Sequence, residues 1–292
     1  MGYFGDGPWS HRSLDLIAED INIELAFICA RWDRPDEYLK KRAGELGIEF
    51  LVSENVNSNS FISRVKKYDA DIFVSMSFDQ IMKNELYSLP TLGSINCHAG
   101  KLPLYRGRNI LNWVLINDEK EFGITVHYID DGVDTGDIIV QNTYGITDKD
   151  NYESLLNVAY EQCPIVLKRA IDLIQSGKAK RTKQSSLSCR PLICTRREEG
   201  DERLVWEMKS REIFNFVRAL SYPGPGALTS MNSIPVRIEK VELINEAPVY
   251  KGIPGAILSK DGGKFIVKTG DSYIAMTDWK SAGKLRVGGR FV

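Results

Sequence analysis

The sequence predicts an α/β protein with a Rossmann-like domain, built on a mostly parallel sheet, and a smaller C-terminal β-barrel domain that is OB-like. In the first 180 residues, short apolar segments alternate with helical patterns at the spacing of strand–helix–strand units. After residue 203, short segments typical of strands follow one another with glycine turns between them. Residues 178–201 are basic, serine-containing and weakly periodic, and we expect a linker at 181–202 that joins a domain over 1–180 to a domain over 203–292.

Five strands are expected before residue 100. The segment from Ile23 to Ala30 is almost continuously apolar, as strands buried on both faces are. Pro35 and Gly47 mark the start and end of a helix, because proline favours the first turn and glycine the position after the last. Helices between the strands make the sheet parallel, with ligands bound at the carboxyl ends of its strands. The expected strands are residues 2–4, 23–30, 48–52, 71–76 and 93–98.

Periodicity predicts the remaining elements. Residues alternate in polarity over 124–129, and a further strand is expected at 137–141. Tyr152 to Gln175 has the period of a helix, with Pro164 as the expected point of a kink. In the C-terminal domain we expect a short helix around 213–220 and strands at 236–244, 255–258, 264–269 and 273–278.

Composition limits the class of protein. The net charge of −1 gives no support for nucleic acid as the main partner. The sequence has no apolar run of eighteen residues and no basic-then-apolar leader. We therefore expect no membrane partner, and we expect a cytoplasmic location. The five cysteines are scattered and odd in number, which favours free thiols, and with three histidines no metal is expected.

The central stretch from Asn96 to Asp134 carries the residues of an acid/base site. Asn96 and His98 stand at the end of an apolar strand, and an acidic, glycine-containing turn ends at Asp134. An amide, an imidazole and a carboxylate delivered by strand ends are suited to proton transfer and to holding a developing negative charge. The residues alone support two interpretations of His98 equally: a buried core histidine with its hydrogen bonds satisfied, or a base.

Other residues have a functional and a structural interpretation of similar weight. The loop containing Gly7 leaves backbone N–H groups at a helix N-terminus, where a phosphate can bind, or it is a tight turn. Arg106 and Arg108 offer forked donors for phosphate oxygens, or they brace their loop. Trp9 and Tyr222 can stack on a base, although packing is the commoner fate of such residues. His11 and His127 have no motif around them and are interpreted as structural.

Three ordered motifs in this stretch resemble the family of formyltransferases that use 10-formyltetrahydrofolate. They are Asn96–His98 after a strand, the loop Leu102–Gly107 with its Leu-Pro and Arg-Gly pairs, and Asp134–Ile138. The resemblance extends over nearly the whole chain, because it continues in the second domain through Trp206, Ile213–Ala219 and Pro223–Ala227.

Within that family, the chain is most similar to enzymes that formylate amino sugars carried on a nucleotide diphosphate, such as the formyltransferase for the UDP-linked amino-arabinose of lipid A. Tyr105–Arg108 with Leu111–Leu115 carries this resemblance, and Cys194–Glu198 resembles the end of the linker in that group. Lys101 is a departure, because many members have Ser-Leu-Leu-Pro after the histidine where this chain has Ala99–Pro103. It can reflect a different sugar or a phosphate contact.

The resemblance implies roles for individual residues. His98 would accept the proton of the attacking amine, Asn96 would donate to the oxyanion, and Asp134 would hold the imidazole. The pterin of 10-formyltetrahydrofolate would lie in a pocket made largely by backbone groups. The residues of that pocket would be Phe78, Gln80, Met82, Asp130 and Asp131, and the nucleotide-linked sugar would contact Gly7, Trp9, Lys101, Arg106, Arg108 and Tyr222.

The resemblance therefore implies formyl transfer to a dTDP-, UDP- or GDP-linked amino sugar for O-antigen or other surface glycan synthesis, by a homodimer. Two alternatives remain open. Methionyl-tRNA formyltransferases have the same fold, motifs and cosubstrate, although a tRNA partner favours a positively charged surface. The second alternative is a non-catalytic module that binds folate or a nucleotide sugar. Such a module would have little reason to keep Asn96, His98 and Asp134.

Overall fold

The computed structural model describes residues 1–292, which divide into two compact units. Unit 1 consists of Met1–Gly107, Phe122–Tyr144 and Asn157–Cys194, and unit 2 of Arg108–Glu121, Gly145–Leu156 and Thr195–Val292. This division differs from the expected one, because two internal segments belong with the C-terminal unit and the expected linker belongs in large part to the first. The fold class is confirmed: a mostly parallel sheet in an α/β unit and an antiparallel sheet in a second unit.

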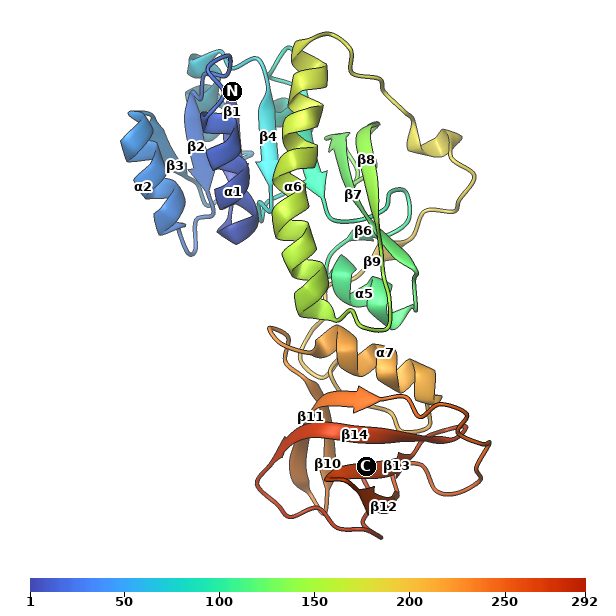
Figure 1. Cartoon of the computed structure of the whole chain (residues 1–292). Helices are drawn as coiled ribbons and strands as arrows, with labels where there is room; N and C mark the ends of the chain where they lie inside the picture. The colour runs from blue at the N-terminus through green and yellow to red at the C-terminus, as the bar shows by residue number, and fades with distance from the viewer. The chain divides into compact units, whose positions relative to one another are not determined.

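Unit 1 is built on a seven-stranded sheet with the order β3-β2-β1-β4-β5-β7-β8. The strands β1 to β5 are parallel, and β7 runs antiparallel to β5 (Figure 1). The strands are β1 Gly2–Gly5, β2 Phe27–Ala30, β3 Glu49–Val52, β4 Phe73–Met76, β5 Ser94–His98, β7 Glu121–Tyr128 and β8 Ile138–Gly145. The carboxyl ends of β1, β4 and β5 therefore meet at one edge of the sheet.

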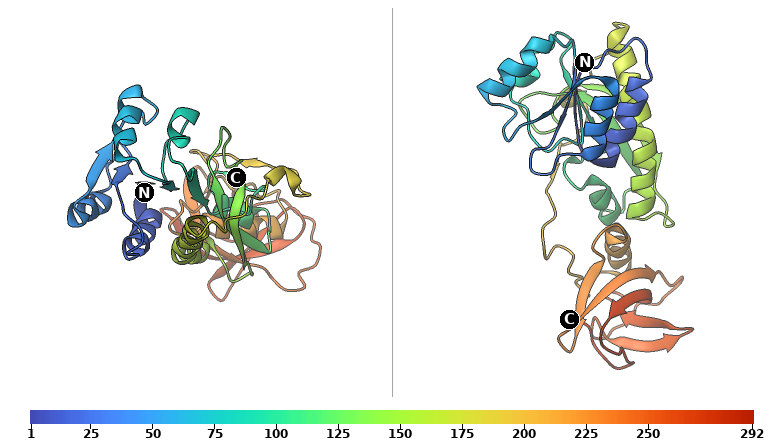
Figure 2. Two further views of the ribbon diagram at one scale, coloured as in Figure 1. Left: turned by 90° about the horizontal axis from the view of Figure 1, so that it is seen from above. Right: turned by 90° about the vertical axis from the view of Figure 1, so that its left-hand side faces the viewer.

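Helices cover both faces of this sheet, with α1, α2 and α6 on one face and α3 and α4 on the other (Figure 2). The α2 helix begins where the side chain of Asp36 accepts the Leu39 N–H, and it ends at Gly47 in the left-handed conformation. The α6 helix continues through Pro164, so the expected kink does not divide it. The helices are α1 Gly7–Ala18, α2 Glu37–Leu46, α3 Asn59–Val65, α4 Asn84–Tyr87 and α6 Tyr152–Gln175. None of the helices in the chain has the long apolar run needed to cross a bilayer.

An aromatic cluster fills one side of unit 1 beneath these strands. The ring of Phe4, on β1, is fully buried and makes edge-to-face contacts with four other phenylalanines. Their ring centroids lie 5.4 to 6.4 Å away, a geometry that adds to the gain from burial. The four partners are Phe27, Phe61, Phe73 and Phe78.

Unit 2 combines an antiparallel sheet of order β10-β11-β14-β13-β12 with α7 and α5. The C-terminal segment bonds to both edges of the sheet, at Ser230 on β10 and at Ala256 next to β12. Helix α5 packs on α7, and Asn112 donates to the Ala219 carbonyl at 2.6 Å. The elements are α5 Ile110–Ile116, α7 Ser210–Leu220, β10 Ala227–Met231, β11 Ile234–Glu242, β12 Ile257–Asp261, β13 Lys264–Lys268 and β14 Tyr273–Ser281.

The structure differs from the expected elements at three places for identifiable reasons. The strand expected from Ile23 begins only at Phe27, because a turn closed by Ile23 N–H and the Asp20 carbonyl precedes it. Strand β10 was not expected, since it follows directly on the proline–glycine turn. Within the expected linker, Gln184 is buried and Ile193–Cys194 (β9) pair with Arg106–Gly107 (β6), which attaches this stretch to unit 1.

Replacing Phe4 by Ala should destabilise unit 1 by about 3–5 kcal/mol, because the cavity left among the aromatic rings cannot close fully. Chemical denaturation followed by tryptophan fluorescence measures this loss. The control is Ile21→Ala: Ile21 is 98% exposed, so its truncation should change the stability by less than about 0.5 kcal/mol. Equal stability of Phe4→Ala and the wild type would contradict the assigned packing.

Candidate active site

The site lies on one face of the sheet where β7 runs antiparallel beside β5. In their antiparallel ladder Asn96 pairs with His127 and His98 with Thr125, so these side chains project from the same face of the sheet. The turn after β7 then carries Asp134 back over the end of β5. Asp134 has a positive φ of 53°, which the surrounding contacts must stabilise in a residue other than glycine.

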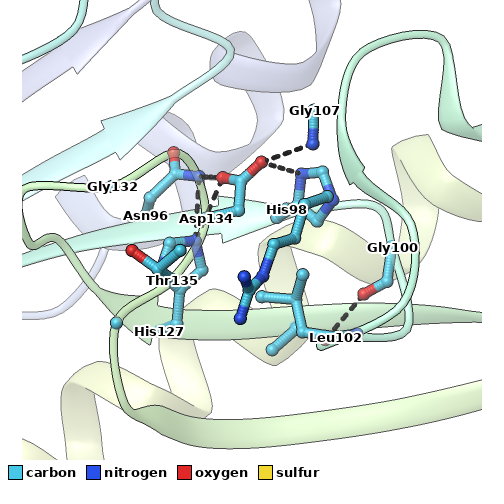
Figure 3. Close-up of polar contacts among 12 residues, drawn as sticks. Asn96, His98, Gly100, Leu102, Gly107, His127, Gly132, Asp134 and Thr135 are labelled. Atoms are coloured by element: carbon cyan, nitrogen blue, oxygen red, sulfur yellow. Dashed lines mark hydrogen bonds and ion pairs between the residues drawn. The ribbon is translucent and has the colours of Figure 1, made fainter. Parts of the chain in front are cut away.

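The Asp134 carboxylate is the meeting point of the site (Figure 3). Its Oδ2 atom accepts the Gly107 N–H at 2.8 Å and lies 3.6 Å from His98 Nδ1. Its Oδ1 atom lies 3.5 Å from Asn96 Nδ2 and 3.4 Å from His127 Nε2. The structure thus brings Asn96, His98 and Asp134 together as expected and adds His127, which sequence analysis left as structural. The signal for His127 was present, because Thr125 and His127 are polar on one face of an otherwise apolar strand.

Burial by itself would raise the pKa of the Asp134 carboxyl. The attraction of the His98 and His127 rings and the Gly107 hydrogen bond outweigh burial and hold this pKa well below its usual range. Asp134 is therefore ionised at neutral pH, and an imidazolium at His98 would be attracted to it.

The backbone fixes the orientation of His98. Its Nε2 atom lies 2.7 Å from the Tyr105 carbonyl, which can only accept, so Nε2 carries a hydrogen and the neutral ring has its lone pair at Nδ1. Gly100 makes room for this ring, since a Cβ at that position would lie 2.4 Å from Nε2. The proton-accepting nitrogen of His98 is thus the one that faces Asp134.

Gln184 joins the two loops of the site and was missed by sequence analysis. Its Nε2 donates to the Asp134 and Gly136 carbonyls, both at 2.8 Å. Its Oε1 accepts from the Arg106 guanidinium, from Nη2 at 2.6 Å and from Nε at 3.1 Å. These two bonds brace the Arg106 loop, and a contact of Arg106 with a phosphate stays a prediction. No local pattern marks Gln184, because it lies fifty residues beyond the turn that it supports.

The residues expected at a pterin pocket occupy two turns of unit 1. The Gln80 side chain accepts from Val56 N–H and donates to the Ser53 carbonyl, so it fastens its own turn. In the acidic turn, Asp130 accepts from Gly132 N–H and Thr135, and Asp131 accepts from the Tyr87 hydroxyl. Of the apolar members, Met82 is buried in the aromatic cluster and Phe78 packs against it.

The residues expected to contact a nucleotide-linked sugar are divided between the units. In unit 1, the Gly7 N–H donates to Asp36 at 2.9 Å, so this one donor at the helix N-terminus is engaged within the protein. A phosphate contact at this loop stays a prediction. Trp9 is half-buried with its ring edge-on to Tyr160, and Lys101 is half-buried. In unit 2, Arg108 and Tyr222 are exposed.

A cavity of about 460 Å³ lies beside the Asp134 turn within unit 1. Arg106, Lys183 and Asp137 supply its charged walls, and Thr135 and Ser185 supply hydroxyls. A second cavity, of about 370 Å³, lies at the opposite ends of the strands around Met1 and Ile72. No cluster of three or more His, Cys, Asp or Glu side chains is arranged to hold a metal ion.

Comparison with known families places this site in one of them. Residues 14–171 match the model of the formyl transferase family, and residues 197–291 match that of the formyl transferase C-terminal domain. The chain therefore belongs to the formyltransferase family and is an enzyme that transfers a formyl group.

Among known proteins, the chain is similar to methionyl-tRNA formyltransferases. It is 32% identical to that of Halalkalibacterium halodurans over 296 residues, which cover 98% of this chain and 91% of the relative. It is 30% identical to that of Clostridioides difficile over 287 residues, which cover 92% of this chain and 88% of the relative.

Among solved structures, the fold is similar to WlaRD, a sugar 3N-formyltransferase crystallised with dTDP and 5-N-formyl-THF. The TM-score is 0.69 at 22% identity, with 97% of this chain and 98% of that chain covered. An N-formyltransferase from Helicobacter canadensis, in complex with folinic acid and dTDP-3-aminofucose, gives a TM-score of 0.70 at 22% identity over 96% and 98%. The methionyl-tRNA formyltransferase of Clostridium thermocellum gives 0.61 at 13% identity over 97% and 100%.

Replacing Asp134 by Asn should lower the free energy of unfolding of unit 1 at pH 7 by about 1–3 kcal/mol, because charge-assisted hydrogen bonds are lost. The folded-state pKa of Asp134 lies below the ordinary value of about 3.9, so this contribution is present above that pH and is lost as the pH falls further. Calorimetric melting at pH 7, 5, 4 and 3 should show the gap between wild type and variant closing at the acid end. An exposed carboxylate, Asp278→Asn, is the control. A gap that stays constant with pH would contradict the assigned contacts.

Replacing Gly100 by Ala should reduce turnover by about a hundredfold or more, because the new Cβ forces the His98 ring out of place. The melting temperature should fall as well, because the same Cβ would lie 2.5 Å from the Tyr105 backbone carbonyl. Gly44→Ala is the matched control: Gly44 lies in α2 with nothing near its missing Cβ, and its replacement should leave turnover unchanged. Wild-type turnover in Gly100→Ala would contradict a role for the ring in this position.

Proposed function

We propose that the protein transfers the formyl group of 10-formyltetrahydrofolate to the amino group of a nucleotide-linked amino sugar. The observation that carries formyl transfer to an amine is that Asn96 and His98, at the end of β5, converge on the carboxylate of Asp134. Transfer to an amine needs a proton acceptor, a donor for the oxyanion and a carboxylate that stabilises the charged acceptor. These three side chains have the chemistry for those tasks.

In this mechanism the free amine attacks the formyl carbon, and a tetrahedral oxyanion forms. His98 takes the amine proton at Nδ1, since Nε2 already holds the hydrogen that it donates to Tyr105. The new Nδ1–H then points at Asp134 Oδ2, and the present 3.6 Å separation is expected to shorten when the ring becomes charged. Asn96 donates to the oxyanion until the intermediate collapses. As the bond from the formyl carbon to the folate nitrogen breaks, the proton held at His98 Nδ1 passes to that nitrogen, so tetrahydrofolate leaves and the neutral ring is restored.

Three observations support a nucleotide-linked sugar as the acceptor. The fold is similar over nearly its whole length to two sugar N-formyltransferases that were solved with dTDP or a dTDP-sugar. The cavity beside Asp134 has Arg106 and Lys183 in its walls, and such cations suit a diphosphate. The net charge of −1 gives no support for tRNA as the partner. We propose surface glycan synthesis as the process served.

Methionyl-tRNA is the second candidate acceptor, and sequence identity favours it. The relatives that share 30–32% identity with this chain are methionyl-tRNA formyltransferases. Both acceptors present a primary amine, so the same three side chains would act on either. The difference between them lies in what holds the rest of the acceptor.

The purified protein should be assayed with 10-formyltetrahydrofolate and each of two acceptor sets: dTDP-, UDP- and GDP-linked amino sugars, and charged initiator tRNA. Formylation of at least one nucleotide sugar, detected by mass spectrometry, with no turnover on the tRNA is expected. Turnover on charged initiator tRNA and on no nucleotide sugar would reverse the proposal.

His98→Ala should lower turnover by a factor of about 10²–10⁴, the usual contribution of a general base. Binding of a non-transferable folate, measured by calorimetry, should persist because the ring is not expected to hold the pterin. Substituting the exposed Lys251, which belongs to unit 2, by Ala controls for handling. Unchanged turnover in His98→Ala would exclude the proposed base.

A further inference from the structure

The segment that forms one wall of the cavity beside the Asp134 turn is attached to the rest of unit 1 at both of its ends. We call residues 182–194 the strap. At its beginning, Thr182 exchanges two backbone hydrogen bonds with Ile138, at 2.9 and 3.0 Å. At its end, β9 pairs with β6. Residues between these attachments line the cavity of about 460 Å³ on one side, and the opposite wall consists of Arg106, Thr135 and Asp137.

The strap holds both the backbone and the carboxylate of Asp134. Gln184, which is 4% exposed, donates to the Asp134 carbonyl at 2.8 Å. Asp134 has a positive φ of 53°, a conformation that a residue other than glycine keeps only where its surroundings hold it. At the other end of the strap, β9 pairs with Gly107, whose N–H donates to Asp134 Oδ2 at 2.8 Å. The position of the strap therefore determines where the carboxylate that faces His98 lies.

The charges of the cavity act on the strap. Arg106 lies in one wall and Lys183, from the strap, in the other. Gln184 Oε1 accepts from Nε and Nη2 of Arg106, so Nη1 remains for a ligand, and Lys183 is exposed. Without an anion between them these two cations repel each other, and Asp137 can offset only one of them. An anion with two or more negative charges turns this repulsion into attraction and draws the strap towards the Arg106 loop.

We propose that the diphosphate of the acceptor binds between Arg106 and Lys183 and, through Gln184, fixes the Asp134 carboxylate for catalysis. Gln184 is then a positioning residue. This inference rests on the proposed function and goes beyond it, because the nucleotide part of the acceptor raises kcat as well as affinity. Binding energy from a part of the substrate that does not react is used to position a catalytic group. An amine without a diphosphate therefore reacts slowly even when it saturates the enzyme.

Inorganic pyrophosphate tests this proposal when a free amino sugar is the acceptor. In the wild type, saturating pyrophosphate should raise kcat for the free amino sugar about fivefold or more, within the usual range of coupling between two sites. Gln184→Met keeps both cations but removes the link, so pyrophosphate should still bind and kcat should no longer respond. Lys183→Met should weaken pyrophosphate binding, measured by calorimetry, about tenfold or more. The control is Lys178→Met, an exposed lysine before the strap, which should behave as the wild type.

A merely structural glutamine would give a different result. Gln184→Met would then lower kcat by the same factor with and without pyrophosphate and keep the response, which would overturn the proposal. Pyrophosphate that does not bind to the wild type, or that binds and leaves kcat unchanged, would overturn it as well. A higher KM for 10-formyltetrahydrofolate in Lys183→Met would assign the cavity to the glutamate carboxylates of the formyl donor, and the proposal would be wrong.

The link can also be measured in the wild-type protein without turnover. Pyrophosphate should slow amide hydrogen exchange, followed by mass spectrometry, in the peptide that contains Gly107, because its N–H is bonded to Asp134. Unchanged exchange in the presence of bound pyrophosphate would overturn the proposal even if the variants fail to fold. If the wild type formylates no nucleotide sugar, the proposed function fails by itself, and this measurement still decides whether an anion in the cavity acts on Asp134.

Discussion

The ionised carboxylate of Asp134 is the interaction on which the site depends. It lies among an amide, two imidazoles and a backbone N–H, and each of these is a donor or becomes one on protonation. A buried carboxylate is costly unless such partners surround it. Here the partners come from β5, from β7 and from the Arg106–Gly107 strand. The charge therefore holds together segments distant in sequence, since Asn96 lies 38 residues and Gly107 27 residues before Asp134.

The surrounding fold maintains this geometry by backbone and side-chain contacts at a greater distance. Gln184 fastens the Asp134 turn and the Arg106 side chain to each other. Gly100 leaves the space that the His98 ring occupies. Gly107 can pack closely against the Cys194 carbonyl because it has no Cβ, which would lie 2.3 Å from that oxygen. Preorganisation of this kind keeps reacting groups in place without cost at the moment of reaction.

The sequence predicted those features that depend on local pattern. Periodicity and capping signals located the parallel strands, the helix ended by Gly47 and the long helix Tyr152–Gln175, and the motifs located Asn96, His98 and Asp134. His127 and Gln184 were missed because their importance depends on register and on contacts distant in sequence. Asn96 and His127 are partners only because β7 pairs with β5 in one particular alignment.

The same reasoning explains why the two compact units do not divide at the stretch that composition predicts. Unit 2 includes α5 and residues 145–156, which lie far upstream of the linker in sequence. Buried side chains of α5 pack on α7, and Arg218 of α7 donates to the Thr147 carbonyl at 2.7 Å. Packing between segments, and not the composition of residues 181–202, decides where unit 1 ends.

This interleaving limits how freely evolution or engineering can recombine the two halves. A chimera joined at residue 202 would supply a foreign α7 to the native α5, and the mismatch would fall on a helix that begins three residues after Gly107. Exchange of C-terminal halves between relatives is therefore expected to succeed only when residues 108–121 and 145–156 are transferred with them.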